Sequence, residues 1–141
     1  MRAVLVACLC FVLLGCEDRP KPKVPADQSQ LKAATDLFWA MDKLGYIISK
    51  EKPQKSRHGC KATEYLAKKG EALFRISVFH CGDSTQAKTL VEHPKTRRVD
   101  ELLRNHGEGG ILQRGPLEVI VRMTHGEKPA ASKLLEEIGA M

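Results

Sequence analysis

Histidine and cysteine are the residue types in this chain that could support metal, redox or nucleophilic chemistry. The five histidines are scattered, and no two of them form an i, i+4 pair that could chelate a metal from one helix face. No Cys-x-x-Cys motif is present, and His80 beside Cys81 makes a poor chelate because neighbouring strand residues point to opposite faces. We therefore expect the histidines to be surface or helix-capping residues. They are His58, His80, His93, His106 and His125.

Sequence motifs of common enzyme classes are missing after residue 16. There is no Gly-x-Ser-x-Gly, no His-Glu-x-x-His, no phosphate-binding loop and no glycine-rich dinucleotide fingerprint. We expect no enzymatic activity, no metal and no cofactor. The alternative left open is a small-ligand carrier or enzyme, with a pocket between sheet and helices that only the fold assembles.

The N-terminus combines four features in a fixed order. Arg2 supplies a positive charge, residues 3–14 are apolar and uncharged, Gly15 is small, and Cys16 follows it. The apolar run has the length of a signal-peptide core and is too short to cross a hydrocarbon core as a helix. The other interpretations are a short membrane helix, a buried strand, or a signal peptide cut elsewhere.

The run Leu13-Leu14-Gly15-Cys16 resembles the lipobox of bacterial lipoproteins, and the resemblance covers only this N-terminal segment. It implies that residues 1–15 are a signal peptide that is removed, and that Cys16 carries a covalent lipid. Two or three acyl chains hold a protein firmly at a membrane. The domain would then face the periplasm or the cell exterior, where nucleic acid is not an expected partner. Glu17, in place of an Asp that favours inner-membrane retention, points to the outer membrane.

The chain after the expected signal peptide divides into a tether and one domain. In residues 16–28, prolines alternate with Arg and Lys, and such a segment is extended and cannot bury itself. Residues 29–141 are enough for a single domain with a modest core. The apolar content of 43% is that of a globular chain and argues against wholesale disorder.

Two thiols are left in this domain, Cys60 and Cys81, and exported domains usually pair such cysteines. Residues 60–69 and 72–81 can form a hairpin about Gly70-Glu71, because glycine at the first central position suits a type II′ turn. In that register the two cysteines lie directly opposite each other, at a separation that a disulfide accepts. A longer turn would displace them, and a metal or redox pair is the rival interpretation.

The remaining segments predict helices around these strands. A first helix runs from an N-cap at Ser29 to Gly45, with Trp39 as a half-buried flank or, alternatively, an exposed ligand platform. Residues 46–48 form a short strand, and residues 50–59 read as a basic loop. The apolar face of the first helix consists of Ala34, Leu37, Phe38, Met41 and Leu44.

The second half of the chain continues this alternation of helices and strands. An Asp83–Gln86 capping box starts a helical region that Pro94 breaks. Gly109-Gly110 reads as a flexible joint, a second hairpin turns at Gly115-Pro116, and a last helix starts near Pro129. Tight turns between strands with one apolar face predict an α+β two-layer sandwich, mainly antiparallel, with helices on one face and possibly a ferredoxin-like arrangement.

An excess of basic residues is the main indication of function. The formal net charge is +6. The positive side chains gather mainly in two segments, residues 50–61 and 95–98, and Lys68-Lys69 lies at the tip of the predicted hairpin. Such groups could contact an envelope protein or an anionic polymer or lipid surface, although a solvated surface with interspersed acids is the alternative. We expect a non-enzymatic binding domain at the membrane. The candidate surface is Lys50, Lys52, Lys55, Arg57, Lys95, Arg97 and Arg98.

Overall fold

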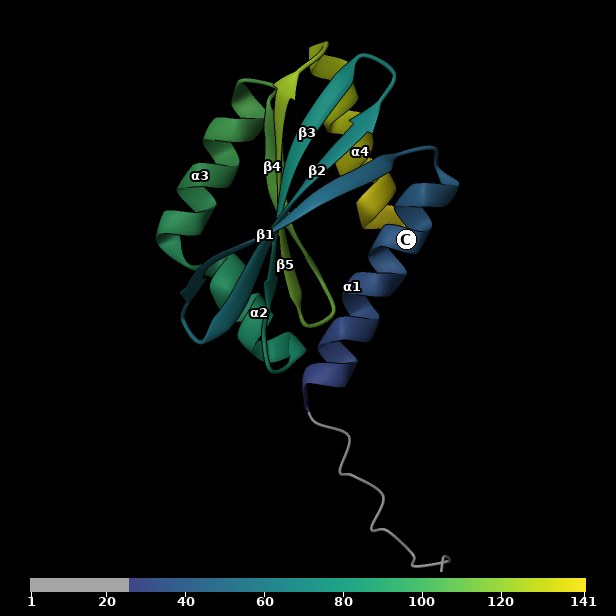
Figure 1. Ribbon diagram of the computed structural model, residues 1–141. Helices are drawn as coiled ribbons and strands as arrows, with labels where there is room; N and C mark the ends of the chain where they lie inside the picture. Colours follow the sequence, from purple (N-terminus) through teal and green to yellow (C-terminus); the bar gives the residue numbers. More distant parts are fainter. Residues whose placement is uncertain (1–25) are drawn as a thin grey trace, which may run out of the picture.

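The structure, a computed structural model, describes residues 26–141 (Figure 1). The chain is of the α+β class that the sequence predicts. Its elements are α1 (Ala26–Lys43), β1 (Ile47–Arg57), β2 (Cys60–Lys69), β3 (Ala72–His80), α2 (Ser84–Glu92), α3 (Pro94–Asn105), β4 (Gly109–Arg114), β5 (Leu117–His125) and α4 (Lys128–Ala140).

The five strands form one sheet in the order β1-β2-β3-β5-β4, and every neighbouring pair is antiparallel. The prediction of a mainly antiparallel sheet with two tight hairpins is therefore confirmed. The order of helices and strands differs from the β-α-β-β-α-β order of a ferredoxin-like fold, because three strands follow one another before α2 begins.

Helices α1 and α4 cover one face of the sheet and form the main core with it (Figure 1). The helical spacing of the apolar residues in these two segments brings them against every second residue of the central strands. The two-layer sandwich is confirmed in this half of the molecule. Fully buried members of the core include Leu37, Met41, Phe74, Ile76, Val119, Val121, Leu134 and Ile138.

Helix α2 packs on the opposite face of the sheet, together with α3 on the same side (Figure 1). Because alternate strand residues point to opposite faces, Ala62 and Phe79 turn away from the main core and meet Ala87 and Leu90 of α2. Helices are thus present on both sides, and the second core is small and lies at the α2 end of the sheet.

The hairpin of β2 and β3 has the predicted register. Ala67 pairs with Phe74, and the ladder continues to Lys61 and His80. Gly70 has a φ of 59°, which a type II′ turn requires at its first central residue. The register ends at the Cys60–Cys81 disulfide, whose Cα atoms are 4.4 Å apart. The disulfide prediction is confirmed.

The basic loop predicted for residues 50–59 is wrong, because most of this segment belongs to β1 and pairs with β2. Its lysines and Pro53 are typical of an edge strand, where charge and a missing amide discourage pairing with other chains. Register shifts occur twice along the pair, so the strand shows no regular apolar alternation. That irregularity explains why the sequence pattern resembled a loop.

The flexible joint predicted at Gly109-Gly110 is also wrong, since both glycines are buried at the start of β4. A Cβ on Gly109 would lie 1.9 Å from the Val121 carbonyl oxygen, so this position requires glycine for close approach rather than for motion. Helix α1 begins at Ala26, before the predicted N-cap at Ser29.

The helix boundaries in the second half follow the predicted signals. Asp83 caps α2 and accepts a hydrogen bond from the Gln86 amide at 2.7 Å. The Gln86 side chain in turn accepts from the Gly82 amide at 2.8 Å, one residue before the position in a standard capping box. Pro94 separates α2 from α3 as predicted.

Candidate functional site

The turn between β1 and β2 lies against the junction between α2 and α3. The rings of His58 and His93 have their centroids 5.3 Å apart. Gln86 of α2 also donates a hydrogen bond to the His58 carbonyl oxygen at 2.9 Å. The fold therefore brings the end of the first basic segment next to the beginning of the second.

We call this region the basic corner and define it by Lys55, Arg57, His58, His93, Lys95, Arg97 and Arg98. Four of these residues are exposed: Lys55, Lys95, Arg97 and Arg98. The Arg57 side chain is 38% exposed. Lys52 is also exposed and lies further along β1, opposite Glu64. Cys16 and the side chain of Lys50 lie outside the described residues.

The start of α3 adds to the positive potential of the basic corner. His93 caps this helix by accepting the Lys95 amide at 3.3 Å, and the first turn of α3 contains no acidic residue. A helix N-terminus carries a partial positive charge, which acidic residues usually balance. Glu92, next to the cap, is 3.9 Å from Lys88 and is exposed. No acidic side chain in the first turn of α3 therefore offsets the positive charge of this helix end.

An ion pair connects the basic corner to the protein interior. Arg57 donates a hydrogen bond to Glu118 of β5, and the Arg57 guanidinium stacks 4.6 Å from the centroid of the Phe79 ring. Glu118 is fully buried, and burial raises its pKa to about 6 although Arg57 favours the charged form. Within residues 26–141, Glu118 Oε2 and Arg57 Nε are buried without a hydrogen-bond partner.

Sequence reasoning missed Glu118 for a specific reason. It occupies a polar position in the alternation of β5, where solvent exposure is expected. The fold covers that position because Arg57 extends over the same face from the edge strand. The one available signal is that Phe79, the strand partner of Glu118, is a large apolar residue facing the same side.

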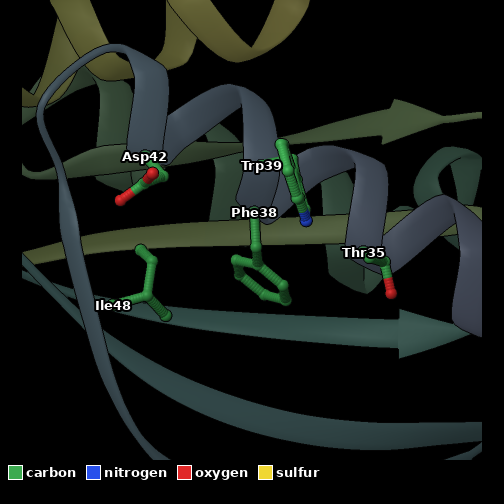
Figure 2. Close-up of a pocket in the computed structure, with 5 residues that line it drawn as sticks. All are labelled: Thr35, Phe38, Trp39, Asp42 and Ile48. Atoms are coloured by element: carbon green, nitrogen blue, oxygen red, sulfur yellow. The ribbon is translucent and has the colours of Figure 1, made fainter.

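A second surface feature is an open groove of about 380 Å³ between α1 and the start of β1, shown in Figure 2. Phe38 points from the helix towards the strands, and its ring centroid is 4.2 Å from that of Tyr65. Trp39 is 66% exposed, which overturns the expectation of a half-buried flank. Ile48 of β1 lines the groove on its strand side. Asp42 of α1 also lines the groove and is its acidic residue.

The C-terminal helix α4 makes a polar contact with the sheet. Glu137 accepts a hydrogen bond from the Tyr46 hydroxyl at 2.6 Å and lies 3.9 Å from Lys69 Nζ. Burial, with Glu137 nearby, holds the pKa of Tyr46 far above its usual range. The tyrosine therefore stays protonated and acts as a hydrogen-bond donor between α4 and the sheet.

Several features bear on the chemistry that the described residues can support. Within residues 26–141, no group of three or more His, Cys, Asp or Glu is placed to hold a metal ion. No helix in this part of the chain is both long and apolar enough to cross a membrane.

No protein-family model, curated protein or solved structure matches the chain. The basic corner is the candidate functional surface because two basic segments far apart in the sequence lie side by side there.

Proposed function

We propose that this chain is a bacterial lipoprotein whose domain, held at a membrane through a lipid on Cys16, binds an anionic partner of the cell envelope. The binding surface is the basic corner. The lipobox-like run Leu13-Leu14-Gly15-Cys16 supports the anchor. The Cys60–Cys81 disulfide is typical of a domain that folds outside the cytoplasm and agrees with export.

One observation carries the binding proposal: two basic segments far apart in the sequence meet in space. Their approach is fixed by the contact of His58 with His93 and by the Gln86 hydrogen bond to His58. Positive charges gathered on one side of a domain raise the local concentration of an anionic partner. The same charges dispersed over the whole surface do so much less. The other residues of the basic corner lie on the end of β1 and on the first turns of α3.

The domain binds its partner and catalyses no reaction. It faces the periplasm or the cell exterior, and the membrane that holds it is the outer membrane. An acidic envelope protein and an anionic envelope polymer both supply the charge that the basic corner requires. The salt dependence of binding is the shared property, since exposed charge pairs are screened at physiological ionic strength.

The test is a binding titration with two defined probes, a polyglutamate peptide and an inorganic polyphosphate. The lipid-anchored protein in nanodiscs is compared with a variant carrying Lys95→Ala, Arg97→Ala and Arg98→Ala. A matched control removes three positive charges elsewhere, with Lys32→Ala, Lys43→Ala and Lys133→Ala. We expect the first variant to bind at least one probe about tenfold more weakly, from exposed pairs worth about 0.5 kcal/mol each.

The control separates a local surface from net charge. Binding through the basic corner predicts that the control keeps nearly wild-type affinity and that raising the salt weakens the wild type strongly. Equal losses in both variants would show that only overall charge matters. Affinity that responds neither to salt nor to the substitutions would overturn the proposal.

A further inference from the structure

Two arginines oppose each other on the face of the sheet that α1 and α4 do not cover. Arg75 of β3 and Arg122 of β5 are direct partners across the strands, so their side chains leave the sheet on the same face. Both residues are exposed. Like charges directly opposite each other on neighbouring strands are destabilising.

The neighbours of this pair in the sheet carry no charge. Arg122 pairs on its other side with Gly109, a buried residue at the start of β4. Leu66 lies on the other side of Arg75. Helix α2 covers this face only near the disulfide, over Ala62 and Phe79. The arginine pair therefore lies on an uncovered part of the sheet, bordered by α3.

A hollow of about 350 Å³ lies between α3 and Arg122. Its wall includes apolar groups that face solvent, since Val99 is 39% and Leu102 is 52% exposed. The combination of an apolar wall with a converging cation is typical of small-molecule sites. The lining consists of Val99, Leu102, Leu103, His106, Glu108 and Arg122.

We propose that this arginine hollow binds a small organic anion, with its carboxylate on Arg122 and its apolar part against Val99 and Leu102, while Arg75 on the neighbouring strand adds to the positive potential. Guanidinium groups bind carboxylates through charge-assisted, often bidentate hydrogen bonds. The proposal rests on the strand register and the hollow, and it is independent of the basic corner and of the lipid anchor.

Two acidic residues limit which ligands fit. Glu64 lies 3.6 Å from Arg75 Nε and also accepts a hydrogen bond from Gln54, so Arg75 is partly neutralised from the β2 side. Glu108 lines the hollow beside Arg122. A dianion would meet repulsion from Glu108, whereas a single carboxylate can occupy the Arg122 side. The site therefore favours monoanions that carry an apolar group.

The experiment uses 3-phenylpropionate as the probe and its neutral amide as the matched ligand control. Binding to the lipid-anchored protein in nanodiscs is followed by the methyl NMR signals of Val99 and Leu102. We expect saturable shifts at these methyls with the acid, and about tenfold weaker binding of the amide, because a charged hydrogen bond is lost.

Variants test the two arginines and the competing acid. Arg122→Gln should weaken binding of the acid several-fold, and Arg75→Gln should weaken it less, because Arg75 acts only through its charge. Glu108→Gln should strengthen binding because a repelling carboxylate is removed. Lys133→Gln, on α4 at the other side of the sheet, is the charge-matched control and should bind like the wild type. The thermal midpoint of Arg122→Gln should equal or exceed that of the wild type, because the substitution relieves like-charge repulsion.

Several results would overturn the proposal. These are equal affinity for acid and amide, unchanged affinity of Arg122→Gln, or saturable shifts confined to residues away from α3. Loss of binding in Arg122→Gln with a lowered thermal midpoint would show a structural role for the arginine instead. Failure of the basic-corner titration would leave this result unaffected, since the two surfaces share no substituted residue.

Discussion

Arg57, at the end of the edge strand β1, binds the carboxylate of Glu118 on β5, with β2 and β3 between their strands. The arginine spans the sheet by lying over the Phe79 ring, which covers its guanidinium. One partner is fully buried and the other is partly exposed, so the pair joins the interior to the basic corner. Its energetics should therefore depend on pH.

Removing Arg57 should destabilise the domain in a pH-dependent way. Arg57→Ala leaves the Glu118 carboxylate buried without its partner, which we expect to cost about 3 kcal/mol of unfolding free energy at pH 7.5. The cost should be much smaller at pH 4.5, where the unpaired carboxyl takes up a proton and becomes neutral. Urea denaturation at the two pH values measures the difference. Lys55→Ala is the control, and a loss for Arg57→Ala that is the same at both pH values would contradict this account.

Glu118→Gln should change the pH profile of stability. Burial raises the pKa of folded Glu118 to about 6, so the folded carboxyl holds its proton more tightly than the unfolded one. Its contribution is therefore present at low pH and is lost as the pH rises from its ordinary pKa, about 4.5, through about 6. The glutamine variant lacks this decline.

The measurement is the difference in unfolding free energy between variant and wild type from pH 4 to 8. We expect the variant to gain about 2 kcal/mol relative to the wild type across that window. Parallel profiles, or a relative loss by the variant, would show that the Glu118 pKa is not raised in the folded protein.

The disulfide should contribute a measurable part of the stability. Cys60 and Cys81 are both fully buried, and their link closes the open end of the β2–β3 hairpin. Replacing both by serine should lower the unfolding free energy by about 3 kcal/mol, through the larger conformational freedom of the unfolded chain. Chemical denaturation with and without a reductant measures this. The reductant should weaken only the wild type, and an insensitive wild type would argue against the bond.

Gly109 and Gly115 give a matched test of backbone crowding at the two ends of β4. Gly109→Ala would drive a Cβ to 1.9 Å from the Val121 carbonyl oxygen at a φ of 151°, and should cost more than about 3 kcal/mol. Gly115→Ala meets nothing within 4 Å, so only its φ of 54° is unfavourable, at about 1 kcal/mol. Thermal unfolding of both variants gives the comparison. Similar midpoints would contradict the close packing of β4 on β5.

The parts of the fold that local rules determine were predictable. The register of β2 and β3 follows from Gly70 at the turn and from period-two alternation, and it places the two cysteines opposite each other. The break at Pro94 and the cap at Asp83 follow from backbone chemistry that needs no tertiary contact.

The parts that depend on distant segments were not predictable. Residues 50–57 lack apolar alternation because they form an edge strand with shifted register, and only pairing with β2 defines them. The exposure of Trp39 depends on how α1 lies over the sheet, which the helix pattern alone does not determine. Glu118 is buried through a side chain from 61 positions earlier, and the contact of His58 with His93 likewise requires the complete fold.

The proposed lipid anchor at Cys16 and the Cys60–Cys81 bond can be tested in one measurement. This is the intact mass of the protein from a bacterial membrane fraction, recorded with and without reduction. We predict the mass of residues 16–141 plus acyl chains, with a gain of two hydrogens upon reduction. A mass without lipid, or one that begins at Met1, would contradict the anchor, and an unchanged mass upon reduction would contradict the disulfide.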